Sequence, residues 1–223
     1  IRDRLIGVDL GGSKTEVILL DRNSREHFRL RLATPKNDYS GTLETIAELV
    51  RSAEEHAGCQ GIPVGVGIPG SVSRLTGRVK NGNSTWLNGE AMERDLAGLL
   101  ERPVTLTNDA NCLTLSEATD GAGAGHGVVF AAILGTGCGA GISVNRQPLA
   151  GPNGLAGEWG HNPLPWTTDE EQRLRPCFCG RNGCNETFLS GTGMALSHRL
   201  MWGETATTHQ IVATAALGEE RAR

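Results

Sequence analysis

The sequence has few aromatic residues, no excess of basic charge and no long hydrophobic run. Aromatic residues make up 4% of the 223 residues, and the formal net charge is −4. Such a balance offers no broad basic surface for nucleic acid or for an anionic membrane. No run of about 18 apolar residues is present, and the first residues lack the basic-then-apolar pattern of a secretory signal. We therefore expect a cytoplasmic protein that binds neither nucleic acid nor membranes.

Glycine is abundant instead, with 31 residues, and it marks many turns and close backbone approaches. The length allows one or two domains, at roughly 150 residues per domain. A small-residue segment at 121–127 follows the helical pattern of 110–118 and precedes a new series of strands. We therefore predict an N-terminal lobe at 1–120 and a C-terminal lobe at 121–223.

A glycine turn between two apolar runs is the first candidate site. Residues 5–8 and 17–20 are rich in β-branched residues and predict a strand and its returning partner. Glycines at the tip let backbone N–H groups approach an anion, and the polar side chains add donors and a positive charge. A Walker loop would lead into a helix instead. The turn predicts phosphate binding by Gly11, Gly12, Ser13, Lys14 and Thr15, although an ordinary hairpin would carry the same pattern.

Strands and helices alternate along the rest of the chain. Period-two alternation or short apolar runs predict strands, and apolar residues at helical spacing predict helices. This order favours a mixed sheet with covered faces, where ligands bind at the carboxyl ends of strands. A second apolar run, a glycine run at 135–141 and a returning strand at 142–144 repeat the design of the first hairpin. The predicted strands are 26–33, 64–68, 104–107 and 128–134, and the predicted helices are 42–57, 91–100, 110–118 and 209–217.

Asp109 is the candidate catalytic group, because it follows a predicted strand directly. A carboxylate fixed at a strand end can accept a proton from a substrate hydroxyl as that oxygen attacks phosphorus. The alternative is that Asn108 or Asp109 only caps the next helix, and both residue types favour that role. One residue can do both, so capping does not exclude catalysis.

A cluster of cysteines with one upstream histidine forms the most specific pattern. Three thiolates and an imidazole make a closed tetrahedral Zn²⁺ site, which has a structural role. Reduced buried thiols, or one disulfide with a cysteine left over, remain the alternative. The predicted zinc ligands are His161, Cys177, Cys179 and Cys184, whereas Cys59, Cys112 and Cys138 are isolated and predicted to be packing residues.

Two glutamates flank this cluster, and an amide-rich loop lies upstream. Glu158 and Glu186 would suit a polyhydroxylated ligand, although a lone glutamate is usually a solvated surface charge. Asn83 belongs to a loop that can bind hydroxyl groups or simply form turns. We interpret Trp86 in that loop as a packing residue.

Six motifs occur in order: DLGGSKT at 9–15, GIPG at 67–70, NDAN at 108–111, GTGCGAG at 135–141, GEWGH at 157–161 and the cysteine cluster with its glutamate at 177–186. Together they resemble the ROK family of bacterial sugar kinases over nearly all of residues 5–193. The segments 83–89 and 157–166 most resemble the fructokinase or mannokinase branch.

The resemblance implies an α/β fold of the actin-like, ribonuclease H-like class, with two lobes, mixed sheets with helices on their faces, and ATP in the cleft. Both glycine hairpins would face the phosphates, and Asp9 would help to position Mg²⁺. The cofactor-binding residues implied in the second hairpin are Gly135, Thr136, Gly137, Cys138 and Gly139.

The resemblance also implies a reaction and a sugar site. Asp109 would be the general base that activates the 6-hydroxyl of a hexose, and His161 would both bind zinc and lie beside the sugar. Fructose is the favoured substrate, with glucose, mannose, N-acetylglucosamine and N-acetylmannosamine as alternatives. A homodimer is expected from the family alone. The implied sugar-binding residues are Asn83, Asn108, Asp109, Glu158, His161 and Glu186.

Two other functions stay open. The same family includes sugar-responsive transcriptional repressors, but these carry an N-terminal helix-turn-helix, whereas the first hairpin here begins within the first residues. Family members are also longer, with a later glycine-rich adenosine-binding segment. We therefore expect a fragment or an incompletely sequenced chain, and a sugar-binding protein without nucleotide binding is the second alternative.

Overall fold

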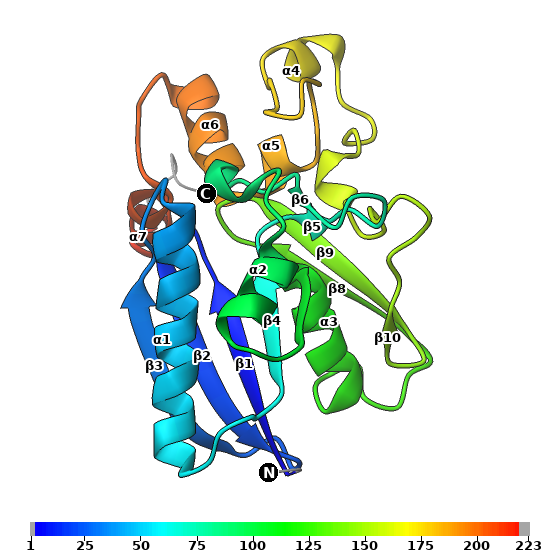
Figure 1. Ribbon diagram of the computed structural model, residues 1–223. Helices are drawn as coiled ribbons and strands as arrows, with labels where there is room; N and C mark the ends of the chain where they lie inside the picture. Colours follow the sequence, from blue (N-terminus) through cyan, green and yellow to red (C-terminus); the bar gives the residue numbers. More distant parts are fainter. Residues whose placement is uncertain (1–2, 219–223) are drawn as a thin grey trace. The chain divides into compact units, whose positions relative to one another are not determined.

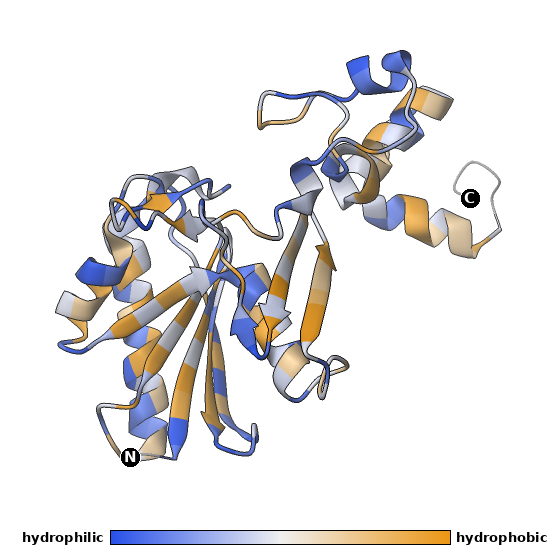
Figure 2. Cartoon of the chain, turned by 90° about the vertical axis from the view of Figure 1, so that its right-hand side faces the viewer, coloured by the Kyte–Doolittle hydropathy of each residue, from blue (hydrophilic) through white to orange (hydrophobic). Residues whose placement is uncertain are grey.

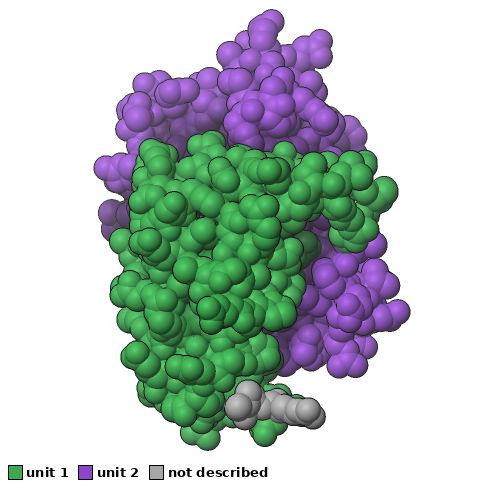
Figure 3. Space-filling model, in the orientation of Figure 1, with its two compact units in different colours: residues 1–112, 150–155 green, residues 113–149, 156–223 purple. Residues whose placement is uncertain are grey.

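The computed structural model describes residues 3–218, which form two compact units (Figures 1 and 3). The first unit takes the described residues up to 112 together with 150–155, and the second takes 113–149 and the described residues from 156 onward. The division predicted from the sequence, 1–120 and 121–223, has no returning segment and stays a prediction. Each unit is described below by itself.

Five strands form the sheet of the first unit, in the order β3-β2-β1-β4-β7. The first three make an antiparallel meander, and β4 and β7 extend it in parallel, so the carboxyl ends of β1, β4 and β7 lie at one edge. Hydrophobic and polar residues alternate along these strands (Figure 2). The strands are β1 Arg4–Leu10, β2 Lys14–Asp21, β3 Glu26–Ala33, β4 Val64–Ile68 and β7 Val104–Asn108, which confirms the strands predicted at 26–33 and 64–68.

Two helices pack with this sheet, α1 (Tyr39–Ala57) and α2 (Met92–Leu99). α1 begins three residues before the predicted start because Asp38 caps it, accepting a hydrogen bond from the Gly41 N–H at 2.9 Å. Gly58 ends α1 in the left-handed conformation, with φ 65°. Each large side chain buried in this core stabilises the fold by about 1.5–3 kcal/mol. The core includes Ile6, Val8, Leu10, Val17, Leu19, Ile46, Leu49, Val50, Met92 and Leu96.

A loop with three short elements connects β4 to α2: β5 (Ser71–Val72), β6 (Val79–Lys80) and η1 (Thr85–Leu87). Gly70 starts this loop with φ 101°, and a Cβ there would lie 2.6 Å from the Lys80 carbonyl oxygen. Only glycine fits that conformation and that contact. The chain therefore needs a glycine at the point where it leaves β4.

The second unit contains a three-stranded antiparallel sheet in the order β10-β9-β8. Its strands are β8 (Val128–Leu134), β9 (Cys138–Val144) and β10 (Gln147–Pro148). β8 confirms the predicted strand, whereas β9 begins earlier than the predicted 142–144, because pairing continues through the glycine run from Leu134 opposite Cys138. α3 (Asp109–Thr119) precedes this sheet and crosses the division between the units.

The rest of the second unit consists of short helices and loops: η2 (Trp159–His161), α4 (Asp169–Arg173), α5 (Glu186–Leu189), α6 (Gly191–Trp202) and α7 (Thr208–Ala216). α7 confirms the predicted last helix, but α6 was not predicted. Among the described residues, no helix is both long enough and apolar enough to cross a membrane.

Candidate active site

The first glycine turn joins β1 to β2 and is closed by a hydrogen bond of 2.9 Å from the Gly11 N–H to the Lys14 carbonyl. The hydroxyl of Thr15 is buried, and it lies 2.8 Å from the hydroxyl of Thr34, which in turn donates to the Gly11 carbonyl at 2.8 Å. Thr15 therefore supports the turn from beneath. The side chains of Ser13 and Lys14 are exposed and available to an anion.

Asp9 and Asp109 lie at the same edge of the first sheet. Asp9 pairs in register with Gly67 of β4, and the next residue of β4, Ile68, pairs with Asn108 of β7. A Cβ on Gly67 would lie 3.8 Å from the Asp109 Cα, so glycine leaves room for the start of α3. Two carboxylates and the first glycine turn therefore meet at the carboxyl ends of the parallel strands, where ligands bind in open α/β sheets.

Asn108 and Asp109 share the N-terminal end of α3. The Asn108 side chain donates to the Gly70 carbonyl at 2.9 Å and accepts from the Ala110 N–H at 2.9 Å. Asp109 Oδ1 accepts from the same N–H at 2.8 Å. Both residues therefore cap the helix, as the alternative interpretation held, and Asp109 does so through its Oδ1.

Desolvation raises the pKa of Asp109 above its ordinary value, and the nearby charge of Asp9 raises it further, against the hydrogen bond from Ala110. Desolvation and the charge of Glu16 raise the pKa of Asp9 in the same direction. A raised pKa makes a carboxylate a better proton acceptor. Burial raises the pKa of the adjacent Cys112 thiol to about 11, so this cysteine stays protonated near neutral pH and is a poor nucleophile.

The amide-rich loop is held by reciprocal bonds between Gly82 and the Asn88 side chain, each 2.9 Å long. Asn83, in the same loop, is exposed. Trp86 packs against the hydrophobic core and donates its indole N–H to the Thr42 hydroxyl at 3.2 Å. The interpretation of Trp86 as a packing residue agrees with these contacts.

The second glycine turn joins β8 to β9 and is closed by a bond of 3.0 Å from the Gly135 N–H to the Gly137 carbonyl. The Cys138 N–H donates to Glu186 Oε2 at 2.9 Å, and the indole of Trp159 donates to the Gly139 carbonyl at 2.9 Å. Residues from three of the sequence motifs, at 135–141, 157–161 and 177–186, are therefore in direct contact.

The four predicted zinc ligands converge within the second unit. Their donor atoms all lie within 4.8 Å of one another, although they come from η2 and from a separate loop. The Cys177 Sγ lies 3.4 Å from His161 Nδ1, and the Cys179 and Cys184 Sγ atoms are 3.7 Å apart. A tetrahedral Zn²⁺ with thiolate and imidazole ligands needs ligand spacings of about 3.4–3.8 Å. The donor set therefore fits a zinc ion.

Local backbone geometry creates this convergence. The Cys177 N–H donates to the Arg181 carbonyl at 2.8 Å, which closes the loop that contains Cys179. Gly180 and Gly183 adopt φ of 86° and 72°, a conformation that other residues rarely take. All six cysteines of the chain are free thiols in the structure. Of the isolated cysteines, Cys138 is buried and Cys59 is half-buried, as expected for packing residues. Cys112 is exposed, contrary to that prediction, because it lies on α3 and only its thiol approaches Gly67.

Two residues that contact the second turn were missed by the sequence analysis. The Gly191 N–H donates to the Gly135 carbonyl at 2.8 Å, and the Thr192 hydroxyl donates to the Thr136 carbonyl at 3.0 Å. The only local signal is Ser190, which caps α6 by accepting from the Gly193 N–H at 3.0 Å. That signal predicts a helix start but not its long-range contact.

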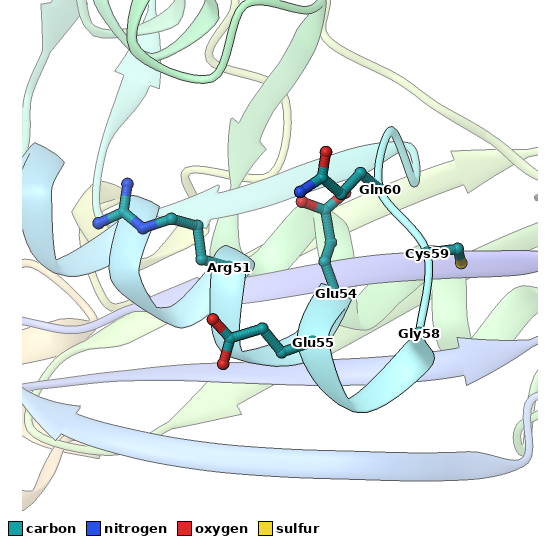
Figure 4. Close-up of a pocket in the computed structure, with 6 residues that line it drawn as sticks. All are labelled: Arg51, Glu54, Glu55, Gly58, Cys59 and Gln60. Carbon is teal, nitrogen blue, oxygen red and sulfur yellow. The ribbon is translucent and has the colours of Figure 1, made fainter.

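A pocket of about 400 Å³ lies elsewhere in the first unit, at the C-terminal end of α1 (Figure 4). It contains none of the predicted site residues. Glu54 in its wall already pairs with Arg102 and accepts from the Ile62 N–H. Its carboxylate therefore serves to stabilise the fold. The residues that line it are Arg51, Glu54, Glu55, Gly58, Cys59 and Gln60.

The mixed sheet with its covering helices and the likeness to solved sugar kinases define an α/β protein with the actin-like ATPase fold, as the resemblance implied. Comparison with known proteins then identifies the family. Residues 5–223 match the ROK family, and the chain belongs to it. The resemblance inferred from the six motifs is thereby confirmed.

Three relatives illustrate the match. An N-acetyl-D-glucosamine kinase of Shigella flexneri serotype 5b (strain 8401) is 36% identical over 221 residues, which cover 97% of this chain and 73% of that protein. The structure of a ROK hexokinase from Thermus thermophilus superposes with a TM-score of 0.83 at 28% identity, covering 98% of this chain and 71% of the other. A ROK family glucokinase from Streptomyces griseus, solved with glucose and AMPPNP, gives a TM-score of 0.78 at 28% identity, covering 98% and 73%.

Proposed function

We propose that the protein is a sugar kinase that transfers the terminal phosphoryl group of ATP to the 6-hydroxyl of a hexose or N-acetylhexosamine. One observation carries the proposal: Asp9, Asp109 and the first glycine turn meet at the carboxyl edge of the first sheet. A carboxylate with a raised pKa beside an anion-binding turn is suited to accept a proton from a hydroxyl as it attacks a phosphate.

In this proposal Asp109 accepts the proton of the 6-hydroxyl, and Asn108 keeps the strand end in place through its bond to the Gly70 carbonyl. Backbone N–H groups of the two glycine turns, with Ser13 and Lys14, stabilise the negative charge of the transferred group. Asp9 would hold Mg²⁺, which neutralises phosphate charge when bound. The other residues of the turns proposed to bind the nucleotide are Gly11, Gly12, Thr15, Gly135, Thr136, Gly137, Cys138 and Gly139.

The sugar would be bound by groups that offer several hydrogen-bond acceptors and donors. Carboxylates and amides suit a polyhydroxylated ligand, because each can bind two hydroxyls. Glu186 Oε2 is already engaged by the Cys138 N–H, so its Oε1 is the oxygen proposed for the sugar. The proposed sugar-binding residues are Asn83, Asn108, Asp109, Glu158, His161 and Glu186.

N-acetylglucosamine is the substrate to test first. The support is the 36% identity to an N-acetyl-D-glucosamine kinase over 97% of this chain. Fructose, which the motif details at 83–89 and 157–166 favoured, becomes the alternative, together with glucose, mannose and N-acetylmannosamine.

The cysteine cluster is proposed to hold a structural zinc ion. His161, Cys177, Cys179 and Cys184 supply four ligands and leave no open position for a water molecule, so the metal would hold the loop and would not take part in the reaction. A stiffened loop would keep His161 and Glu186 in place for the sugar.

The test is a coupled assay of ADP release by the purified protein with ATP, Mg²⁺ and each candidate sugar. Turnover with one sugar well above the others is expected, and the position of the phosphate is then read by NMR. Absence of turnover with every sugar, while the sugars still bind, would favour a sugar-binding protein or a repressor instead.

A further inference from the structure

The second glycine turn rests on the N-terminal end of α6. Gly191 and Thr192, the first two residues of α6, each donate one hydrogen bond to the turn, to the carbonyls of Gly135 and Thr136. The two bonds measure 2.8 and 3.0 Å. Two consecutive peptide groups of the turn are therefore held by the same helix, α6.

These bonds fix the direction of two N–H groups. The described chain contains no cis peptide bond, and in a trans peptide the carbonyl and the following N–H point in opposite directions. With the carbonyls of Gly135 and Thr136 turned toward α6, the N–H groups of Thr136 and Gly137 point away from it. Among residues 3–218 neither N–H has a hydrogen-bond partner in the structure.

The next N–H of the turn is used differently. Cys138 donates to Glu186 Oε2 and is thereby occupied. The turn therefore presents two adjacent N–H donors, and adjacent backbone donors in a turn are suited to bind an anionic oxygen.

We propose that Thr192 is a positioning residue for phosphoryl transfer, whose hydroxyl orients the Thr136–Gly137 peptide so that its N–H meets a phosphate of the nucleotide. This inference rests on the proposed function, because it takes the second turn as a phosphate-binding element. Thr192 itself touches neither substrate; it acts through the peptide that it holds.

Contacts with Ser190 and with α7 hold Thr192 and the first turn of α6 in place. Its hydroxyl lies 2.8 Å from the Ser190 hydroxyl, which donates to the Glu186 carbonyl at 2.6 Å. Thr208 donates to the Gly191 carbonyl at 2.8 Å and holds the same end of α6 from α7. The orientation of Thr192 is thus set by its neighbours before any ligand binds.

The experiment compares Thr192→Val, which keeps the shape but removes the donor, with Thr192→Ser, which keeps the hydroxyl. Thr119→Val is the matched control, because the Thr119 hydroxyl also donates to a backbone carbonyl, of Leu115 at 2.7 Å, but within α3. For Thr192→Val we expect a rise of about 3–10-fold in KM for ATP, the size expected for one hydrogen bond, with KM for the sugar unchanged. Thr192→Ser should restore the wild-type value.

Calorimetric titration with AMPPNP separates this inference from the proposed function. Wild-type protein that binds AMPPNP but phosphorylates no sugar would refute the kinase function alone, and Thr192→Val should still weaken AMPPNP binding by the same factor. Equal affinity of wild type and Thr192→Val for AMPPNP would overturn the positioning role, as would a parallel rise in both KM values with a lowered Tm.

Discussion

The Cys138 N–H donates to Glu186 Oε2 at 2.9 Å, and 48 positions of sequence separate the two residues. The bond joins the second glycine turn to α5, which begins two residues after Cys184 of the cysteine cluster. Glu186 therefore supports the turn with one oxygen, whatever it binds with the other. A hydrogen bond to a charged group of this kind contributes about 1.5–3 kcal/mol.

This contact gives a prediction for Gly137. A Cβ at that position would lie 2.6 Å from Glu186 Oε2, so Gly137→Ala should displace the carboxylate and break its bond to Cys138. We expect a destabilisation of about 1–3 kcal/mol, measured by denaturant unfolding. Gly135→Ala is the control for stability, because a Cβ there meets no atom within 4 Å. Equal unfolding free energies for the two variants would contradict the role of Glu186.

Asp109 is predicted to be required for transfer but not for binding. Asp109→Asn keeps the shape and can still accept from the Ala110 N–H, but it cannot take a proton from the 6-hydroxyl. We expect kcat to fall by at least ~10²-fold while the sugar Kd changes little, as measured by steady-state kinetics and calorimetry. A near-normal kcat would leave helix capping as the role of Asp109.

The raised pKa of Asp109 predicts the direction of the pH dependence. A general base works only when deprotonated, so kcat/KM should fall on the acid side at a pH above the ordinary aspartate value of 3.8.

The same pKa shift affects the stability of the fold in the opposite direction, because stability is lost as the pH rises. The fold favours protonated Asp109, so this contribution to stability is present below pH 3.8 and is lost as the pH rises through the raised pKa.

Asp109→Asn should therefore not lower Tm at neutral pH, because the amide removes a group whose charged form the fold disfavours. Differential scanning calorimetry at pH 7 tests this point. A clear loss of Tm would show that the charged carboxylate stabilises the native state, against the direction of its pKa shift.

The buried hydroxyl pair beneath the first turn predicts a purely structural effect. Thr15→Val would leave the Thr34 hydroxyl without its neighbour at 2.8 Å in a buried position. We expect a loss of about 0.5–1.5 kcal/mol in unfolding free energy, the usual contribution of one hydrogen bond, because the Thr34 hydroxyl keeps its bond to the Gly11 carbonyl. Thr45→Val is a suitable control, since the Thr45 hydroxyl contacts only the Gly41 carbonyl of its own helix among the described residues. An equal loss in both variants would argue against a special role of the pair.

Local sequence patterns predicted much of the fold, because the spacing of apolar residues determines which face of a strand or helix is buried. The strand at 26–33 alternates apolar and polar residues, and α1 carries its apolar residues at helical spacing up to Gly58. α6 escaped prediction because it opens with Gly-Thr-Gly, residues of low helix propensity, and it is held by its contact with the turn at 135–136.

Part of the candidate site could likewise be predicted from the sequence, and part could not. The convergence of the cysteine cluster could be predicted because the spacing brings three of its four side chains together within one short loop. The contacts of Glu186 and Thr192 with the second turn could not, since hydrogen bonds across 48 and 56 positions leave no periodic signal in the sequence. The patterns also leave the choice of sugar open, because the segments 83–89 and 157–166 favoured fructose whereas the relative from Shigella flexneri is an N-acetyl-D-glucosamine kinase.

Zinc binding is predicted at about one ion per chain. Cys177→Ser or Cys179→Ser should lose the metal and lower Tm, because the ligands hold together a loop that contains little regular secondary structure. Metal content is measured by plasma mass spectrometry on protein purified without chelators. Cys59→Ser is the control, because Cys59 lies in the first unit, outside the cluster. If the purified wild type contains no metal, and a chelator leaves its Tm unchanged, the cluster is a set of reduced thiols and the zinc proposal fails.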